Sequence, residues 1–134
     1  MDEGKFELFA PFTKIDTRTA EFEAWATLEE VDASGEIIDI DKSWPYFEAL
    51  AKQFSDNTGG VNFGPLREQH DPQKASGHLI SPPVIKTRAD GVRGIFIHGL
   101  PTDPVTKSKL ISKTLTGISI GGAYVGTKED VIIN

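Results

Sequence analysis

The sequence predicts a small α+β domain in which a mostly antiparallel, barrel-like β-sheet has helices packed around it. Several segments alternate apolar and polar residues with a period of two, which is typical of strands with one solvated face. Two other segments repeat apolar residues at helical spacing and place a proline where a first helical turn tolerates it. At 134 residues the chain is long enough to bury one core, so residues 1–134 are interpreted as a single domain.

The first two strands are predicted at residues 5–12 and 20–31, where apolar and polar side chains alternate. The run Asp32-Ala33-Ser34-Gly35 predicts the turn that follows them. Within the second strand, the alternation predicts one apolar side with Phe22, Ala24, Ala26 and Leu28, and an opposite side with Glu21, Glu23, Trp25 and Thr27.

A helix is predicted at about residues 43–55, with Pro45 in its first turn. The flexible run at 57–60 ends it. Its apolar residues recur at helical spacing and are interpreted as core: Trp44, Phe47, Leu50, Ala51 and Phe54.

The next segments predict a short strand and a hairpin. Residues 61–70 form the strand, which leads to His70 and is broken at once by Asp71-Pro72. Residues 77–98 form the hairpin, and the turn at 89–91 joins its two arms. His70 is therefore expected at a strand end where a loop opens, which is a common place for a reactive side chain.

A second helix is predicted at residues 103–115, with Asp103 as its N-cap and Pro104 in its first position. Strand character returns at 117–126 and again at 130–133. The predicted apolar stripe of this helix comprises Val105, Leu110, Ile111 and Leu115.

Composition and charge exclude several classes of function. The net charge of -6 argues against nucleic acid or an anionic membrane as the main partner. The absence of cysteine excludes disulfides and thiolate chemistry, and three histidines without a close pair leave no recognisable zinc motif. We therefore expect no metal and no cofactor. No apolar run approaches the roughly 20 residues of a membrane span, and no apolar signal core opens the chain, so we expect a cytoplasmic protein.

The clearest chemical signal is the pair formed by Ser119 and His70. Small residues follow the serine closely, and an upstream histidine can supply the base that a serine nucleophile needs. Residues 117–121 also match the nucleophile elbow of α/β-hydrolases. That interpretation is rejected, because the elbow requires a helix after the serine and a histidine later in the chain.

The order of these motifs resembles the prohead (head maturation) proteases of tailed bacteriophages, which share a fold with the herpesvirus assembly proteases. The residues that carry the resemblance are Arg67-Glu68-Gln69-His70, Ala75-Ser76-Gly77-His78-Leu79 and, after a hairpin and a helix, residues 116–125. The resemblance covers most of the chain. It implies that Ser119 is the nucleophile and His70 the general base. Gly121 and Gly122 lack Cβ atoms, so substrate backbone could approach closely there.

One feature of that family is missing here. Its members usually carry a third, acidic catalytic residue a few tens of residues beyond the serine, whereas this chain ends 15 residues after Ser119. Glu129 and Asp130 are the only acids after the serine, and neither sits in the expected pattern. Three alternatives stay open: the domain continues beyond residue 134, the third role falls to another residue, or the activity is weakened.

The resemblance implies a serine endopeptidase that cleaves capsid and scaffold proteins inside the immature phage head, in the host cytoplasm, and that processes itself. It also favours a homo-oligomer. Two alternatives are a catalytically silent assembly domain of the same fold, and a small β-barrel binding module without viral connection.

The remaining histidines and acids receive more ordinary interpretations. His98 is expected to be partly buried with a satisfied side chain. His78 is either a second histidine near the site or a plain strand residue. Six acids are interpreted as solvated faces: Glu21, Glu23, Glu29, Glu30, Asp39 and Asp41.

Overall fold

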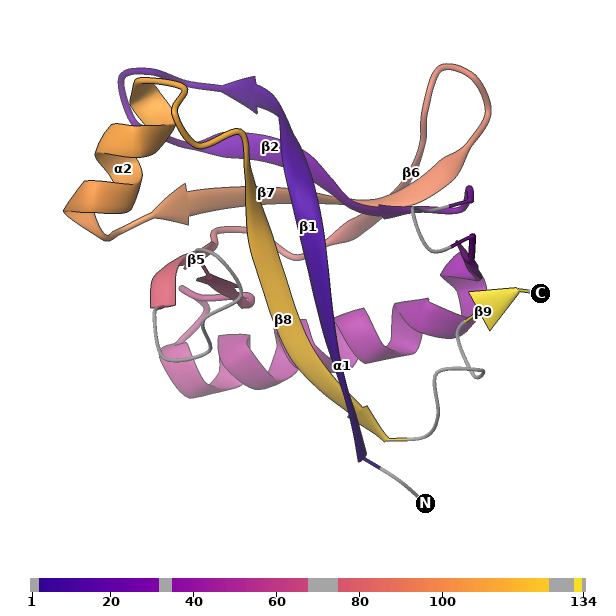
Figure 1. The fold of residues 1–134 in the computed structure, drawn as a ribbon. Coiled ribbons are helices and arrows are strands. Elements are labelled where there is room, and N and C mark those ends of the chain that lie inside the picture. Colours follow the sequence, from indigo (N-terminus) through magenta and orange to yellow (C-terminus); the bar gives the residue numbers. More distant parts are fainter. Residues whose placement is uncertain (1–2, 32–34, 68–74, 126–131, 134) are drawn as a thin grey trace.

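The computed structural model describes residues 3–31, 35–67, 75–125 and 132–133. Within these residues the chain forms two helices and a nearly closed, antiparallel, barrel-like sheet (Figure 1), so the predicted α+β class is confirmed. The elements are β1 (Glu3–Ile15), β2 (Phe22–Leu28), β3 (Ile37–Ile38), α1 (Ile40–Thr58), β4 (Pro65–Arg67), β5 (Ala75–Leu79), β6 (Val84–Thr87), β7 (Arg93–Pro101), α2 (Pro104–Ile111), β8 (Gly117–Val125) and β9 (Ile132–Ile133).

The main sheet closes because β2 has a partner on each side. Its strand order is β2-β1-β8-β4-β5-β7-β6, and β2 also pairs with β7, so the six strands from β2 to β7 in this order form a ring and β6 extends from β7. All of its strand pairs are antiparallel. Figure 1 shows β1 and β8 crossing the front of this barrel together, with α1 below it and α2 at one end. The short strands β3 and β9 form a separate pair.

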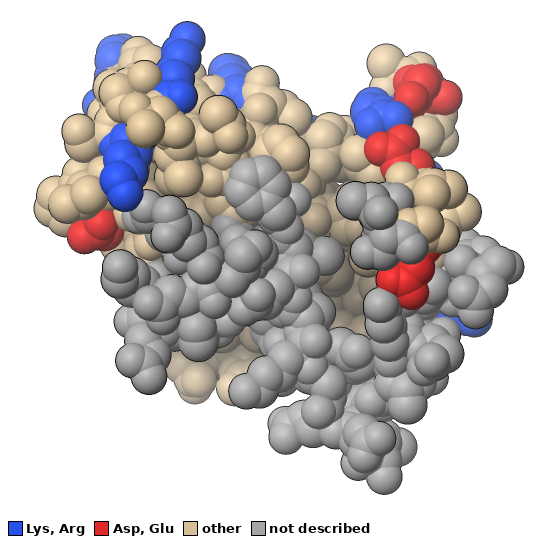
Figure 2. All heavy atoms as spheres, in the orientation of Figure 1, with Lys and Arg blue, Asp and Glu red and all other residues tan. Residues whose placement is uncertain are grey.

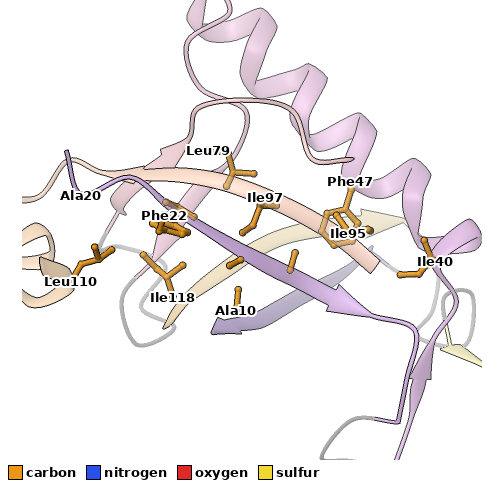
Figure 3. Close-up of a cluster of buried hydrophobic side chains, with 13 residues drawn as sticks. Ala10, Ala20, Phe22, Ile40, Phe47, Leu79, Ile95, Ile97, Leu110 and Ile118 are labelled. Atoms are coloured by element: carbon orange, nitrogen blue, oxygen red, sulfur yellow. The ribbon is translucent and has the colours of Figure 1, made fainter. Parts of the chain in front are cut away.

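The core fills the inside of the barrel with alternate residues from facing strands. Phe22 and Ala24 of β2 and Ile95 and Ile97 of the neighbouring β7 are all almost completely buried there. Figure 3 shows Phe22, Ile95 and Ile97 in this cluster. The predicted apolar side of β2 is therefore confirmed at these positions and at Ala26. The helices complete the core with Ile40 and Phe47 from α1 and Leu110 from α2.

The first helix begins earlier than predicted. It starts at Ile40, and Asp39 is the N-cap, whose side chain accepts a hydrogen bond from the Lys42 N–H at 3.0 Å. The Ile40 N–H donates to a Glu29 carboxylate oxygen at 2.7 Å, a tertiary contact that local sequence does not reveal. Pro45 consequently lies inside the helix rather than in its first turn. The helix also runs longer than predicted and ends at Thr58, before Gly59 in a left-handed conformation.

The second helix begins as predicted and ends earlier. Asp103 is the N-cap and Pro104 follows it, but the last helical residue is Ile111 rather than residue 115. The buried side chains are Thr106 and Leu110, whereas Val105 is 59% exposed and Ile111 38% exposed. The predicted apolar stripe is therefore confirmed at Leu110 and wrong at Val105 and Ile111, while Leu115 lies beyond the end of the helix. Thr106 can be buried in their place because the Asp103 carboxylate accepts a hydrogen bond from its hydroxyl at 2.9 Å.

The predicted hairpin at 77–98 is correct only in its second part. β6 and β7 form a hairpin around residues 89–91, where the Arg88 N–H donates to the Val92 carbonyl at 2.7 Å. Residues 77–79 belong instead to β5, which pairs with the far end of β7 and with β4. The strand predicted at 61–70 is confirmed as β4 at 65–67 only; residues 61–64 are not strand, and 68–70 lie outside the described residues.

The interpretation of the six acids as solvated faces holds for Asp41, whose side chain is 73% exposed, but it is incomplete for three others. Glu30 binds the Arg88 guanidinium at 2.9 Å, and Glu29 and Asp39 bond to other elements or cap a helix. Glu29 is tied to the Ile40 N–H and lies 3.4 Å from the Arg93 guanidinium, which also binds Asp41 at 3.0 Å. Asp39 caps α1. These contacts link the end of β2 and the start of β7 to the first turn of α1.

A close approach between β5 and β7 requires glycine at position 77. A Cβ atom at Gly77 would lie 2.3 Å from the Leu100 carbonyl oxygen and 2.6 Å from the Pro101 Cα. Because backbone must move to admit it, we expect Gly77→Ala to lower the free energy of unfolding by about 1–3 kcal/mol in urea denaturation. Ser108→Ala, at an exposed position of α2, serves as the control and should change it by less than about 0.5 kcal/mol. Equal stability of the Gly77 variant and the wild type would contradict this packing.

The hairpin tip carries a titratable contact. The hydrogen-bonded Arg88 guanidinium, 2.7 Å from the carboxylate, lowers the pKa of Asp90 to about 2. That pKa lies below the unfolded value of about 3.9. The stabilisation that this contact gives the folded state is therefore fully present above about pH 4 and is lost as the pH falls through about 2.

We expect Arg88→Gln to raise the pKa of Asp90 towards its ordinary value in an NMR titration of the side-chain carboxyl groups. Arg93→Gln is the matched control, since Arg93 instead holds the pKa of Asp41 low through a hydrogen bond. A wild-type Asp90 that titrates at its ordinary pKa would show that the Arg88 contact does not form.

Candidate functional site

Ser119 lies in the middle of the barrel wall. It is part of β8, opposite Phe9 of β1 on one side and Arg67 of β4 on the other. Its neighbour Ile118 is buried in the core, and successive residues of a strand face opposite sides of a sheet. The register therefore assigns position 119 to the outer face of the barrel. The structure describes the backbone of Ser119 and not its side chain.

His70 belongs to the segment that connects β4 to β5. Residues 68–74 lie outside the described residues, so the predicted contact between the His70 imidazole and the Ser119 hydroxyl stays a prediction. The two described residues that flank this segment are cross-strand partners, because Arg67 pairs with Ala75. Arg67 also pairs with Ser119, so the chain enters the segment directly beside the serine.

Of the other predicted site residues, two lie in a described strand and two lie outside the described residues. Gly121 and Gly122 lie in β8 opposite Glu7 and Phe6 of β1, on the same strand as Ser119. Their predicted role in admitting substrate backbone stays a prediction. Glu129 and Asp130, the candidates for the third catalytic residue, lie outside the described residues.

The N-terminus of α2 contacts the strand next to this region, which the sequence analysis did not anticipate. The Ser76 carbonyl of β5 accepts hydrogen bonds from the Thr102 N–H at 2.8 Å and the Asp103 N–H at 3.1 Å. Ser76 directly follows Ala75, the partner of Arg67. The only signal in the sequence was the Asp-Pro pair at 103–104, which predicts a helix start without revealing what that start contacts.

His98 lies far from Ser119 in the strand order. It belongs to β7, which two strands separate from β8 in either direction around the barrel. Its side chain is 39% exposed, and its Nε2 atom lies 3.8 Å from a Glu21 carboxylate oxygen. The expected partly buried histidine is confirmed. The same pair borders a surface hollow of about 160 Å³ that also involves Lys14, Asp16 and Glu23.

His78 lies closer to the candidate site. It belongs to β5 opposite Pro65 of β4, and β4 alone separates β5 from β8. Its Nδ1 atom is 3.0 Å from the carbonyl oxygen of Leu79. This position keeps both interpretations of His78 open, because one intervening strand separates it from the strand of the serine.

On the face shown in Figure 2, the described charged residues gather mainly in two places. Figure 2 shows Lys and Arg gathered towards the α2 end, where Lys107, Lys109 and Lys113 lie in sequence, and Asp and Glu with Arg at the β6–β7 hairpin end. Among the described residues, no group of three or more His, Asp or Glu side chains is placed to hold a metal ion. Neither described helix is both long and apolar enough to cross a membrane.

Comparison with known proteins gives no match. No protein-family model matches the sequence, no curated protein matches it, and no solved structure matches the fold. The candidate site therefore rests on the residues themselves and on the strand register.

Proposed function

We propose that the chain is a serine endopeptidase that cleaves capsid and scaffold proteins within the immature head of a tailed bacteriophage, and that it processes itself. The observation that carries this proposal is the pairing of Arg67 with Ser119. Arg67 precedes His70 by three residues, and three residues of chain span at most about 10 Å. That reach is compatible with an imidazole meeting the serine hydroxyl.

The surroundings of this strand pair support a rigid site. Leu66 of β4 and Ile118 of β8 each precede one member of the pair, and both are almost completely buried. Leu66 also pairs with Ile120. The backbone on both strands is thus anchored in the core, and the strand register assigns position 119 to the opposite face of the sheet. Sites on such anchored strands hold their geometry better than sites on loops.

The proposed chemistry is acyl transfer. The Ser119 hydroxyl attacks the scissile carbonyl while the His70 imidazole accepts its proton, and the imidazole then returns that proton to the leaving amine. Water hydrolyses the resulting ester by the same route. An imidazole suits this exchange because its unperturbed pKa lies near 6.5.

The third role is the open part of the proposal. Removing the orienting acid from a triad costs about 10⁴-fold in rate, so a chain without one would be a slow enzyme. Glu129 and Asp130 are the candidates within this sequence. A catalytically silent assembly domain is the limiting case, and it differs from the proposal in leaving Ser119 unreactive.

Removal of the nucleophile tests the activity directly. We expect Ser119→Ala to reduce cleavage of a co-expressed capsid precursor by roughly 10⁴-fold or more, because the acyl-enzyme can no longer form. Ser108→Ala, an exposed serine of α2, is the matched control and should process the precursor normally. Undiminished processing by the Ser119 variant would end the proposal.

A fluorophosphonate probe separates the enzyme from a silent domain. We expect the probe to modify Ser119 in the wild type, and mass spectrometry of the labelled peptide detects this. We expect no modification in His70→Ala, because a serine hydroxyl without a neighbouring base is a weak nucleophile. If circular dichroism shows that the wild-type chain is folded and Ser119 is still not labelled, the chain is a silent domain.

A further inference from the structure

The strand pair that carries Ser119 is connected to α2 through a β-bulge. On β4 and β5, Leu66 pairs with Gly77 and the next residue, Arg67, pairs with Ala75. Ser76 is therefore the extra residue of the bulge. Bulges of this kind bend a strand and re-aim the residues beside them, and they recur next to active sites.

The helix α2 binds the bulge by its N-terminus. The N–H groups of Thr102 and Asp103 both donate to the Ser76 carbonyl, at 2.8 and 3.1 Å. Ser76 is only 3% exposed, so these bonds form away from water, where losing a partner costs more than at the surface. The start of α2 thus fixes the backbone at the bulge.

The Asp103 side chain in turn caps the first turn of α2. Its Oδ2 atom accepts hydrogen bonds from the Thr106 N–H at 3.0 Å and from the Thr106 hydroxyl at 2.9 Å, while the Asp103 carbonyl accepts from the Lys107 N–H at 2.9 Å. The helix has 8 residues and buries only Thr106 and Leu110 among them. A helix this short depends on its cap and its packing, because it is marginal by itself.

We propose that Asp103 is a positioning residue for Ser119, acting through the Ser76 bulge. Its carboxylate fixes the first turn of α2 against Thr102 and Asp103, the two residues whose N–H groups hold the Ser76 carbonyl. The bulge at Ser76 in turn sets the pairing of Ala75 with Arg67 and hence of Arg67 with Ser119. The catalytic consequence of this coupling rests on the proposed peptidase function, whereas the coupling itself does not.

Asp39 provides a matched control. It is the N-cap of α1, and its side chain accepts from the Lys42 N–H at 3.0 Å, as Asp103 accepts from Thr106. In the described residues its bonds are to its own helix, to Lys42 and Ser43. Asp39→Ala and Asp103→Ala therefore remove the same kind of cap, and only the second removes a cap that is bonded to the bulge.

Amide hydrogen exchange of the full chain, at a temperature well below unfolding, tests the coupling. We expect Asp103→Ala to speed exchange in peptides that contain Arg67 and Ser119 by about 10-fold, through local opening, and Asp39→Ala to leave those peptides unchanged. Asp103→Asn keeps a capping oxygen and should restore the wild-type rates. Unchanged exchange in Asp103→Ala, or equal acceleration by both alanine variants, would overturn the inference.

The rate of fluorophosphonate labelling at Ser119 tests the catalytic consequence. We expect a decrease of about 10- to 100-fold in Asp103→Ala, since small misplacements of a nucleophile have effects of this size, and wild-type rates in Asp39→Ala and Asp103→Asn. Wild-type labelling rates in Asp103→Ala would refute the positioning role while the peptidase proposal stands. A wild-type chain that is not labelled would end the peptidase proposal, and the exchange experiment would then decide the coupling by itself.

Discussion

The pairing of β2 with β7 is the constraint on which the rest of the structure depends. It joins the first strand of the order to the last but one, so the sheet encloses its apolar face instead of leaving it open on one side. Two glycines of β7 permit it: a Cβ atom at Gly94 would lie 2.6 Å from the Thr27 carbonyl oxygen, and one at Gly99 would lie 2.6 Å from the Phe22 ring. The phenyl ring of Phe22 consequently packs directly against the β7 backbone inside the barrel.

Closure also divides the sheet into an inner surface, which is filled by packing, and an outer surface. Side chains such as Ile95, Ile97 and Ile118 are almost completely buried in the interior. Position 119 belongs to the other face of the same strand. The packed interior therefore anchors β8, and the strand register assigns position 119 to the outer face.

The two helices are attached by polar contacts at their N-termini, in addition to their apolar residues. Glu29 of the segment after β2 accepts from the first N–H of α1, and Arg93 joins Glu29 to Asp41. The start of α2 is held by the Ser76 carbonyl of the β5 bulge. Because the first N–H groups of a helix have no partner within the helix, each helix start is a natural point of attachment to a sheet.

Local sequence determined the features that arise from neighbouring residues. The alternation in β2, the turn at 89–91, the cap at Asp103 and the strand character of 117–125 are properties of a few adjacent side chains, and each was predictable. Ser119 and His70 were also identified as candidate residues from sequence, through their residue types, their order in the chain and the family resemblance. Their chemical contact stays a prediction.

Tertiary structure alone decided the features that need partners distant in the chain. The start of α1 at Ile40 depends on Glu29, and the burial of Thr106 depends on where the first turn of α2 docks. Strand partners were likewise undecided, since local sequence does not show that β5 and β6 pair with different ends of β7. The physical reason is that the spacing of apolar residues and their secondary-structure propensity indicate which face of an element is apolar. Which other element covers that face depends on how the whole sheet closes.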